Sequence, residues 1–348
     1  MDVLLFVVIL GTLIVGHEFG HFVAARIASI RVDEFGLGFP PRLATLFTRG
    51  GTRFTLNWIP LGGFVRPAGE DDPSVPGGLA GASKRVRAFV LLSGPAANIL
   101  LAILAFTAAY KFAAPDFDRV LLTTIVAGSP AEHAGILPGD IVRGVDGVPI
   151  RGYQSLQKAI AERLGREVVL LVDRQGTALE FRLVPRTDPP EGQGPLGVIT
   201  GNPTRAVAWP EAARLGLQST QLQFSELIRL PARLARGEIA PGEARVSGLK
   251  GMYDMLSWAG EVDRSSQRPF LTLNLIAVIS AGLALANLLP IPALDGGRLM
   301  FVLIEALLGR RISPRNEGLA HAIGFALLLA LMVYVNLQDF LNPIALPR

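Results

Sequence analysis

Hydrophobic residues along the chain gather in four long stretches separated by polar segments. Each stretch is about 20 residues long, which is the length that an α-helix needs to cross roughly 30 Å of hydrocarbon. The polar segment between the second and third stretches is long enough to form a domain of its own. The pattern therefore predicts four transmembrane helices and one large polar insert. The predicted spans are Val3 to Ala25, Ala88 to Tyr110, Phe270 to Leu289, and Leu319 to Leu337.

The segment after the first span has a different pattern. Residues 52–58 alternate polar and apolar side chains and follow the turn signal Gly50-Gly51, which is typical of a β-hairpin. A plain amphipathic loop is the alternative. A hairpin that close to a span is expected to lie against the membrane, where such backbone is tolerated when protein or a cavity covers it.

The polar insert predicts a compact α+β module that resembles a PDZ domain and ends near Arg186. A Pro/Gly linker over 187–204 and amphipathic helices over 205–263, broken at Pro241-Gly242, are expected to follow. Such helices can lie on a membrane surface. The elements expected in the module are strands at 123–126, 167–173 and 178–184, and a helix from Tyr153 to Leu164.

Composition supports a membrane protein. Hydrophobic residues make up 50% of the 348 residues and the mean hydropathy is +0.42, which is more apolar than an ordinary soluble domain. The first stretch starts without a positive region and contains two histidines and a glutamate, so we expect a retained helix instead of a cleaved signal. The chain has no cysteine, which excludes disulfides and thiolate metal sites. No aromatic-interleaved basic patch suggests nucleic acid.

Basic residues predict the orientation of the spans. Positive-inside bias places the segments that follow the first and third spans in the cytoplasm, and both termini and the insert outside. The arginines of the insert do not oppose this, because long domains cross the membrane largely regardless of charge. The basic residues that decide the orientation are Arg26, Arg31, Arg42, Arg49, Arg53, Arg66, Lys84, Arg85, Arg87, Arg298, Arg310, Arg311 and Arg315.

The first span contains His17-Glu18-Phe19-Gly20-His21. Two histidines four residues apart lie on one helical face and can bind one metal ion, while the glutamate between them can act as a general base. Ionisable groups in a hydrocarbon span are costly and rarely stay without a partner. A structural hydrogen-bond cluster is the alternative, but three such groups in one turn favour a zinc site.

A catalytic zinc site needs a third protein ligand. Asp295 is the better candidate, because Pro290 and Pro292 end the third span just before it and Gly296-Gly297 would permit a tight turn. A helix-capping role for this aspartate is the alternative. Of the two remaining histidines, His133 belongs to the insert, and His321 is expected at the membrane interface instead of on the metal. The predicted orientation brings the first-span motif and Asp295 to a similar depth, near the cytoplasmic leaflet.

These motifs and their order resemble the site-2 protease family of intramembrane zinc metalloproteases, in particular the bacterial regulator-of-sigma-E protease type. The likeness rests on the first-span motif, on the segment from Asn287 to Gly297, and on the PDZ-like insert. It implies that His17, His21 and Asp295 bind Zn²⁺ and that Glu18 is the general base.

The resemblance also implies substrate contacts. Residues 59–65 resemble the membrane-embedded hairpin of the family, thought to pair with an unwound substrate as an added strand. Residues 93–98 resemble a shared segment of small residues that would allow close packing against the first span. Some relatives carry a second asparagine where this chain has Gly282, so that contact is not carried over. The residues expected to contact substrate are Asn287, Asn98, Phe54, Leu56, Trp58, Gly62 and Gly63.

The expected fold is a mainly α membrane protein with four transmembrane helices, a membrane-associated β-hairpin region and one extracytoplasmic PDZ-like α+β domain. The expected divisions are an N-terminal membrane part over 1–112, the PDZ-like domain over 113–187, a linker with amphipathic helices over 188–268, and a C-terminal membrane part over 269–348.

The expected function is zinc-dependent hydrolysis of peptide bonds in or beside the bilayer. By resemblance, the substrates are single-span proteins such as anti-sigma factors or remnant signal peptides, cut first by a site-1-type protease, in the bacterial inner membrane. A membrane-anchored PDZ adaptor with a structural zinc is the alternative, and it predicts normal function without Glu18. A metal transporter is disfavoured, because one ligand cluster does not make a pathway across the membrane.

Overall fold

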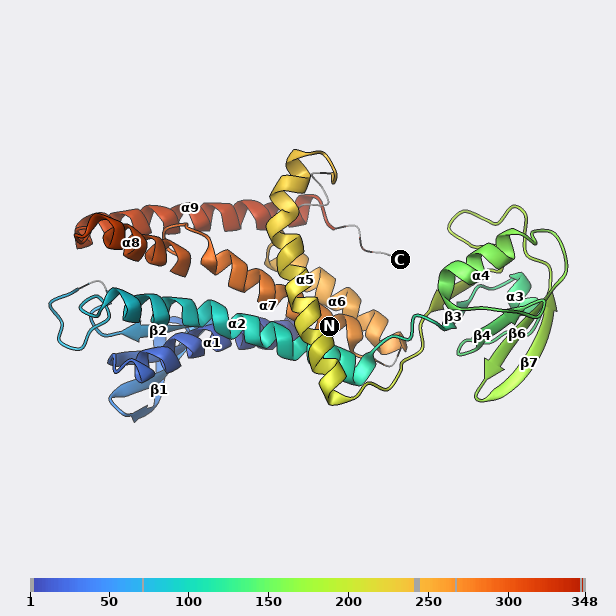
Figure 1. The fold of residues 1–348 in the computed structure, drawn as a ribbon, viewed down its shortest axis with the longest axis horizontal. Helices are drawn as coiled ribbons and strands as arrows, with labels where there is room; N and C mark the ends of the chain where they lie inside the picture. The colour runs from blue at the N-terminus through green and yellow to red at the C-terminus, as the bar shows by residue number, and fades with distance from the viewer. Residues whose placement is uncertain (1–2, 71, 241–244, 267, 345, 347–348) are drawn as a thin grey trace. The chain divides into compact units, whose positions relative to one another are not determined.

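The computed structural model describes residues 3–70, 72–240, 245–266, 268–344 and 346. It divides into two compact units. Unit 1 combines Met1–Ala109 with Trp209–Arg348 and contains the long apolar helices, whereas unit 2, Tyr110–Ala208, is built on a β-sheet (Figure 1). The candidate site lies in unit 1.

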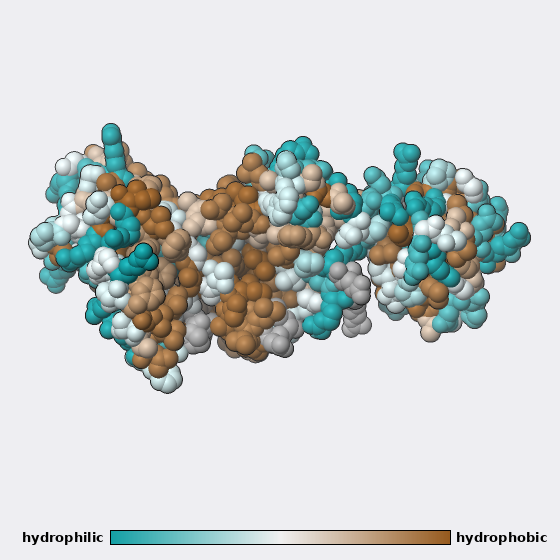
Figure 2. All heavy atoms as spheres, turned by 90° about the horizontal axis from the view of Figure 1, so that it is seen from below, coloured by the Kyte–Doolittle hydropathy of each residue, from teal (hydrophilic) through white to brown (hydrophobic). Residues whose placement is uncertain are grey.

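Four helices of unit 1 are long and apolar enough to cross a membrane, which confirms the four hydrophobic stretches. Apolar side chains cover broad areas of the surface of this unit (Figure 2). Exposed apolar area of this extent is unfavourable in water, whereas a bilayer supplies apolar surroundings to helices whose backbone groups are paired internally. The chain is therefore a multi-pass membrane protein. Its candidate spans are α1 (Val3–Ile27), α2 (Lys84–Ala113), α7 (Phe270–Leu288) and α9 (Pro314–Leu341).

Small residues let α1 and α2 approach closely. A Cβ atom on Gly20 of α1 would lie 2.4 Å from the carbonyl oxygen of Ser93 and 2.8 Å from the Cβ of Ala97, both on α2. Helices in a bilayer associate through such close van der Waals packing. The segment of small residues over 93–98 therefore packs against the motif-bearing helix, as expected from the sequence.

Strands β1 (Val32–Arg49) and β2 (Thr52–Pro67) form the antiparallel sheet of unit 1. Gly50 and Gly51 connect them with φ angles of +59° and +82°, a conformation that glycine adopts at little cost. The predicted hairpin is confirmed and the plain loop is excluded. Both strands are long and irregular, so residues 34–37 of β1 pair with 53–56 on one side and with 63–66 on the other.

An aromatic cluster holds this sheet against α1. The ring of Phe54 lies 5.7 Å from Phe22 of α1, 5.7 Å from Phe35 and 4.5 Å from Phe47, where the rings stack. Aromatic pairs at these distances are favourable beyond the area they bury. The cluster fixes the sheet beside the half of α1 that carries the two motif histidines.

The chain after α7 differs in one respect from the expectation. Helix α7 ends at Leu288, before the two prolines, as predicted, but Gly296 and Gly297 form no tight turn. They lie in the first turn of a further helix, α8 (Asp295–Leu308), which the sequence pattern did not predict. A Cβ atom on Gly296 would lie 2.4 Å from the carbonyl oxygen of Leu288. The two glycines let the start of α8 lie close against the backbone after α7, and this close packing brings Asp295 toward the bundle.

Helices α5 (Trp209–Ala235) and α6 (Leu249–Ser266) confirm the amphipathic helices of the sequence analysis; the expected break at Pro241-Gly242 lies outside the described residues. The start of α6 is tied to α9. Asp339 accepts hydrogen bonds from the amides of Gly248 and Gly251 at 2.8 and 2.9 Å. Asn336 accepts one from the Leu249 amide at 3.0 Å.

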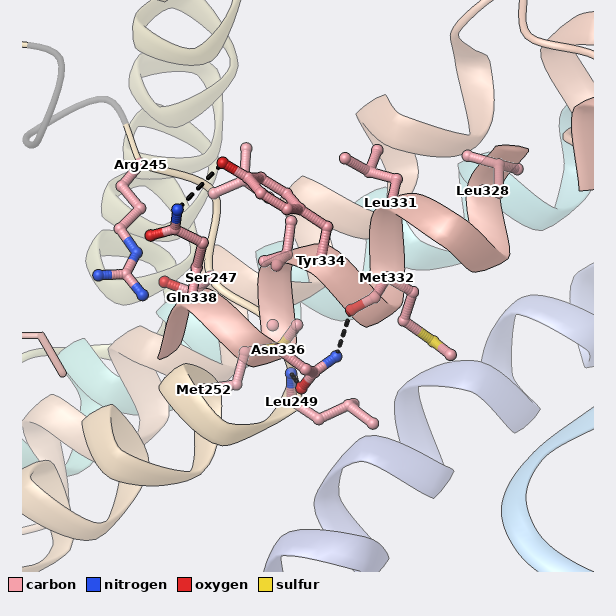
Figure 3. Close-up of a pocket in the computed structure, with 13 residues that line it drawn as sticks. Arg245, Ser247, Leu249, Met252, Leu328, Leu331, Met332, Tyr334, Asn336 and Gln338 are labelled. Atoms are coloured by element: carbon pink, nitrogen blue, oxygen red, sulfur yellow. Dashed lines mark hydrogen bonds between the residues drawn. The ribbon is translucent and has the colours of Figure 1, made fainter. Parts of the chain in front are cut away.

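An apolar cavity of about 900 Å³ lies beside this junction, between the start of α6 and α9 (Figure 3). Leu328, Leu331 and Met332 of α9 and Met252 of α6 contribute to its wall. None of the candidate site residues lines it. The cavity that holds them is smaller and lies near the start of α8.

Unit 2 has a sheet in the order β7-β6-β4-β3-β8, with β5 paired to β4. The predicted strands and helix are present, but β8 lies inside the segment expected to be linker, so that expectation is wrong at 198–201. Strand β8 pairs with β3 at the edge of the sheet. The elements are β3 (Val120–Ile125), α3 (Pro130–His133), β4 (Ile141–Val145), β5 (Val148–Pro149), α4 (Gly152–Ala161), β6 (Val168–Arg174), β7 (Thr177–Leu183) and β8 (Val198–Gly201).

A buried carboxylate connects two strands of this unit. Asp140 is 1% exposed, accepts a hydrogen bond from the Leu137 amide at 3.0 Å, and pairs with Arg174 at 2.7 Å. Burial alone would raise the pKa of Asp140, but the hydrogen bonds from Arg174 and the Leu137 amide outweigh it and lower this pKa below its ordinary value. The carboxylate therefore stays ionised and stabilises the fold.

Candidate metal centre

The candidate site is a cavity of about 270 Å³ whose walls come from α1, β2, α2, the end of α7 and the start of α8. His17, Glu18 and His21 contribute from α1, and Asp295 contributes from α8. Residues 278 positions apart in sequence, His17 and Asp295, are therefore in contact. The structure brings together all four residues that the sequence analysis assigned to the metal and the catalytic base.

The potential ligand atoms of three of these residues converge. His17 Nε2 lies 3.0 Å from Asp295 Oδ2, His21 Nε2 lies 3.2 Å from the same oxygen, and the two Nε2 atoms are 3.1 Å apart. Ligands bound to zinc at roughly 2.0–2.1 Å in tetrahedral geometry lie about 3.3 Å from one another. The three atoms thus already have nearly the spacing of three corners of a zinc site, and the donor set of two imidazoles and one carboxylate fits this ion.

His17, His21 and Asp295, the ligand trio, are the group found among the described residues in which three histidine or carboxylate ligand atoms lie close enough to share one metal ion. The other two histidines lie elsewhere. His133 of unit 2 is within hydrogen-bond distance of the Ser129 carbonyl, at 2.9 Å. His321 of α9 accepts a hydrogen bond from the Ala293 amide at 2.7 Å through Nδ1. His321 therefore supports the segment before Asp295 and is not part of the trio.

Helix α2 orients the histidines. The Nδ1 atom of His21 lies 2.8 Å from the carbonyl oxygen of Val90, so Nδ1 donates its proton there and Nε2 keeps a free lone pair. Gly94 of α2 leaves room for both rings, because a Cβ atom there would lie 2.2 Å from Nε2 of His21 and 2.7 Å from Nε2 of His17. The α2 backbone thus supports the trio directly.

Glu18 points toward the sheet. Its Oε2 accepts a hydrogen bond from the backbone amide of Val65 in β2 at 2.9 Å. That amide fixes one carboxylate oxygen and leaves Oε1 for another partner. The sequence motif placed Glu18 between the histidines, but it gave no indication that a strand amide would hold it.

The residues expected to contact substrate lie in several places. Asn287 and Gly63 line the same cavity as the trio, and the Asn287 amide donates to the Leu283 carbonyl at 3.0 Å. Leu56 and Gly62 line a different cavity, of about 600 Å³, along α1. Trp58 is 64% exposed. The remaining two are Phe54, which belongs to the aromatic cluster, and Asn98, which is 1% exposed and faces His17.

The structure adds two charged residues that the sequence analysis did not assign to the site. Glu70 and Arg298 line the cavity and form an ion pair at 2.7 Å. Arg298 follows Asp295 by three residues, a spacing that places both on one face of a helix. The three-residue spacing would have indicated a shared face only if a helix had been predicted there. Glu70, in the connection that follows β2, carried no sequence signal.

Comparisons with known proteins identify the family of the chain. The model of peptidase family M50 matches residues 5–331. A protein of Rhizobium meliloti, provisionally named a zinc metalloprotease, is 32% identical, with 96% of this chain and 95% of the relative aligned. The zinc metalloprotease RasP of Oceanobacillus iheyensis is 27% identical, with 97% and 98% aligned. Because the family model matches most of the chain and a relative of more than 30% identity aligns over nearly its whole length, the chain belongs to peptidase family M50.

Proposed function

We propose that this protein is a zinc metallopeptidase of the membrane in which His17, His21 and Asp295 hold the metal and Glu18 is the general base. Membership of peptidase family M50 and the similarity to zinc metalloproteases support the activity and the metal. The observation that carries the residue assignment is the convergence of the three ligand atoms within 3.0–3.2 Å of one another beside Glu18. When bound, zinc acts as a Lewis acid that stabilises negative charge developing on oxygen during peptide hydrolysis.

The residues around the metal divide the remaining work. The Val65 amide holds Glu18 Oε2 at 2.9 Å, which leaves Oε1 to take a proton from the attacking water and pass it to the leaving amine. Asn287 lines the cavity from the end of α7 and is positioned to hydrogen-bond the substrate backbone. Peptide bonds in a helix are shielded by the hydrogen bonds of the helix itself, so a substrate helix has to unwind before its peptide bond reaches Glu18.

The strongest test compares cleavage by three forms of the purified protein in detergent, using a tagged single-span model substrate with a helix-destabilised segment. The wild type should cleave, and a zinc chelator should abolish cleavage. Glu18→Gln should keep zinc and lose cleavage by about 10²- to 10⁴-fold, because it removes the proton acceptor. Glu180→Gln, which changes an exposed residue of unit 2, is the matched control. Cleavage retained by Glu18→Gln would refute the general-base assignment and favour the adaptor.

Unit 2 supports a PDZ-like role in substrate selection. A cavity of about 310 Å³ lies between α4 and β8, with Leu156 and Ile160 on one side and Leu196 and Val198 on the other. Because β8 is at the edge of the sheet, an extended peptide could add to it as a further strand. We propose that this groove receives the exposed chain end left by a site-1-type protease. Candidate substrates are anti-sigma factors and remnant signal peptides.

The basic residues beside the spans favour one orientation in the bacterial inner membrane. Unit 2 is then on the outer side, and the segment between α7 and α9 is on the cytoplasmic side. The absence of cysteine makes this testable, because single introduced cysteines carry the only thiol of the chain. Thr187→Cys should react with an impermeant thiol reagent from the outside of cells. Arg310→Cys should react only after the membrane is opened. The reverse pattern would overturn the orientation.

A further inference from the structure

The side-chain amide of Asn98 is buried beside the metal ligands. Its nitrogen faces His17, and this placement is incompatible with metal binding by His17. Asn98 of α2 is 1% exposed, and its Nδ2 lies 3.4 Å from Nδ1 of His17. Its Oδ1 is buried and has no hydrogen-bond partner among the described residues. A buried carbonyl oxygen without a donor costs about 1–3 kcal/mol in proteins, and an amide inside a membrane helix has no water to turn to.

The nitrogen that faces Asn98 decides the direction of this hydrogen bond. His17 presents Nε2 to Asp295 and to His21 Nε2, so Nε2 is the atom directed at the metal. A neutral imidazole that binds a metal through Nε2 carries its proton on Nδ1. Nδ1 of His17 is then a donor, and the Nδ2 of Asn98 is a donor too, so the two cannot bond to each other.

Exchanging the oxygen and nitrogen of the Asn98 amide gives Oδ1 a donor and removes the contact between two donors. The oxygen and nitrogen of an asparagine amide are assigned from the hydrogen-bond network, and the exchange moves no other atom. Oδ1 then accepts from His17 Nδ1, as the Val90 carbonyl accepts from His21 Nδ1 at 2.8 Å. Each histidine thereby has an acceptor on α2 behind it.

We infer that Asn98 is a positioning residue that accepts a hydrogen bond from His17 Nδ1 and so keeps His17 Nε2 available for the metal. This inference rests on the proposed function, because it takes His17 as a zinc ligand. It assigns Asn98 a role behind the ligand, in place of the substrate contact expected from the sequence. The backbone supports the same geometry, since the Ser280 hydroxyl of α7 donates to the Asn98 carbonyl at 2.8 Å and fixes this turn of α2.

The proton on His17 Nδ1 in the zinc-loaded protein is the direct test. The chain has four histidines, so protein labelled with ¹⁵N-histidine gives a sparse NMR spectrum, and loss of signals in His17→Ala assigns them. With zinc bound, the proton on His17 Nδ1 should be protected from exchange with water, and Asn98→Leu should remove that protection. A His17 Nδ1 proton that exchanges freely in the wild type, or as slowly in Asn98→Leu as in the wild type, would overturn the inference. This outcome is independent of cleavage and so is distinguishable from a failure of the proposed function.

Zinc affinity, measured by competition with a chromophoric chelator, gives the second readout. Asn98→Leu keeps a similar shape without an acceptor and should lower zinc affinity by about 10- to 100-fold, the usual effect of losing such a partner. Asn98→Asp keeps an acceptor oxygen and should stay near the wild type. Leu104→Ala, which changes an exposed residue of the same helix, is the matched control. Wild-type zinc affinity in Asn98→Leu would overturn the inference, as would an equal loss in Asn98→Asp and Asn98→Leu. If neither variant can be purified, exchange of the His17 Nδ1 proton in the zinc-loaded wild type decides alone.

Discussion

Gly94 tests whether α2 shapes the metal site. A Cβ atom on this residue would lie 2.2 Å from His21 Nε2 and 2.7 Å from His17 Nε2. Ordinary contacts between such atoms are roughly 3.5 Å, so Gly94→Ala creates overlaps of about 1.3 and 0.8 Å with the two rings. Either the rings turn or α1 and α2 separate by a similar distance.

Zinc tolerates little of this displacement, because metal–ligand distances are held to within about 0.2 Å. Two of the three proposed ligands are disturbed together. We therefore expect Gly94→Ala to lower zinc affinity by at least about 100-fold, beyond the loss that follows from removing one supporting residue. Helix propensity works in the opposite direction, since alanine is favoured over glycine by about 1 kcal/mol in a helix.

The assay is zinc content after dialysis together with chelator competition on purified Gly94→Ala. Gly11→Ala is the matched control, since a Cβ atom there has nothing within 4 Å, and it should bind zinc as the wild type does. Wild-type zinc binding by Gly94→Ala would refute the reasoning, because it would mean that the rings do not face Gly94 when the metal is present.

Three further predictions concern stability. Because the folded pKa of Asp140 is lowered, the stability it supplies is present above its unfolded pKa of about 3.9 and is lost as pH falls through the folded value. Asp140→Asn should cost unit 2 about 2–3 kcal/mol at neutral pH and flatten this acid dependence, as measured by hydrogen exchange in the whole protein. Arg87 pairs with buried Glu305 at 2.5 Å, so Arg87→Leu should cost about 3–5 kcal/mol by leaving a buried charge; unchanged thermal unfolding would contradict this. Phe54→Ala should destabilise the sheet of unit 1 by about 2–3 kcal/mol, less than for a fully buried ring, and expose 44–56 to limited proteolysis; an unchanged digestion pattern would argue against the aromatic anchor.

Much of the membrane architecture could be predicted from the sequence. Span length, alternation in 52–58 and the turn at Gly50-Gly51 are local properties, because side-chain periodicity along a helix or strand depends on neighbouring residues alone. The same locality explains the first-span motif, in which positions 17 and 21 share a helical face by their spacing.

Elements with weak local patterns were not predicted. Helix α8 was not predicted, since two glycines in its first turn disfavour a helix and their close contact with the α7–α8 connection has no sequence signal. Strand β8 is four residues long and lies in a segment rich in proline and glycine. It forms because β3 offers it an edge to pair with, and pairing between distant segments cannot be deduced from the pattern of either.

For the candidate site, the sequence by itself determined the chemistry of the side chains: two histidines and a glutamate on one helical turn, with an aspartate after a broken helix. Only the tertiary structure decided that Asp295 reaches the histidines, that the Val65 amide holds Glu18, and that Asn98 faces Nδ1 of His17. Each of these contacts joins residues 47 to 278 positions apart. The physical reason is that a side chain's type fixes what it can bond to, whereas its partner is fixed by packing between helices and strands that lie far apart in the chain.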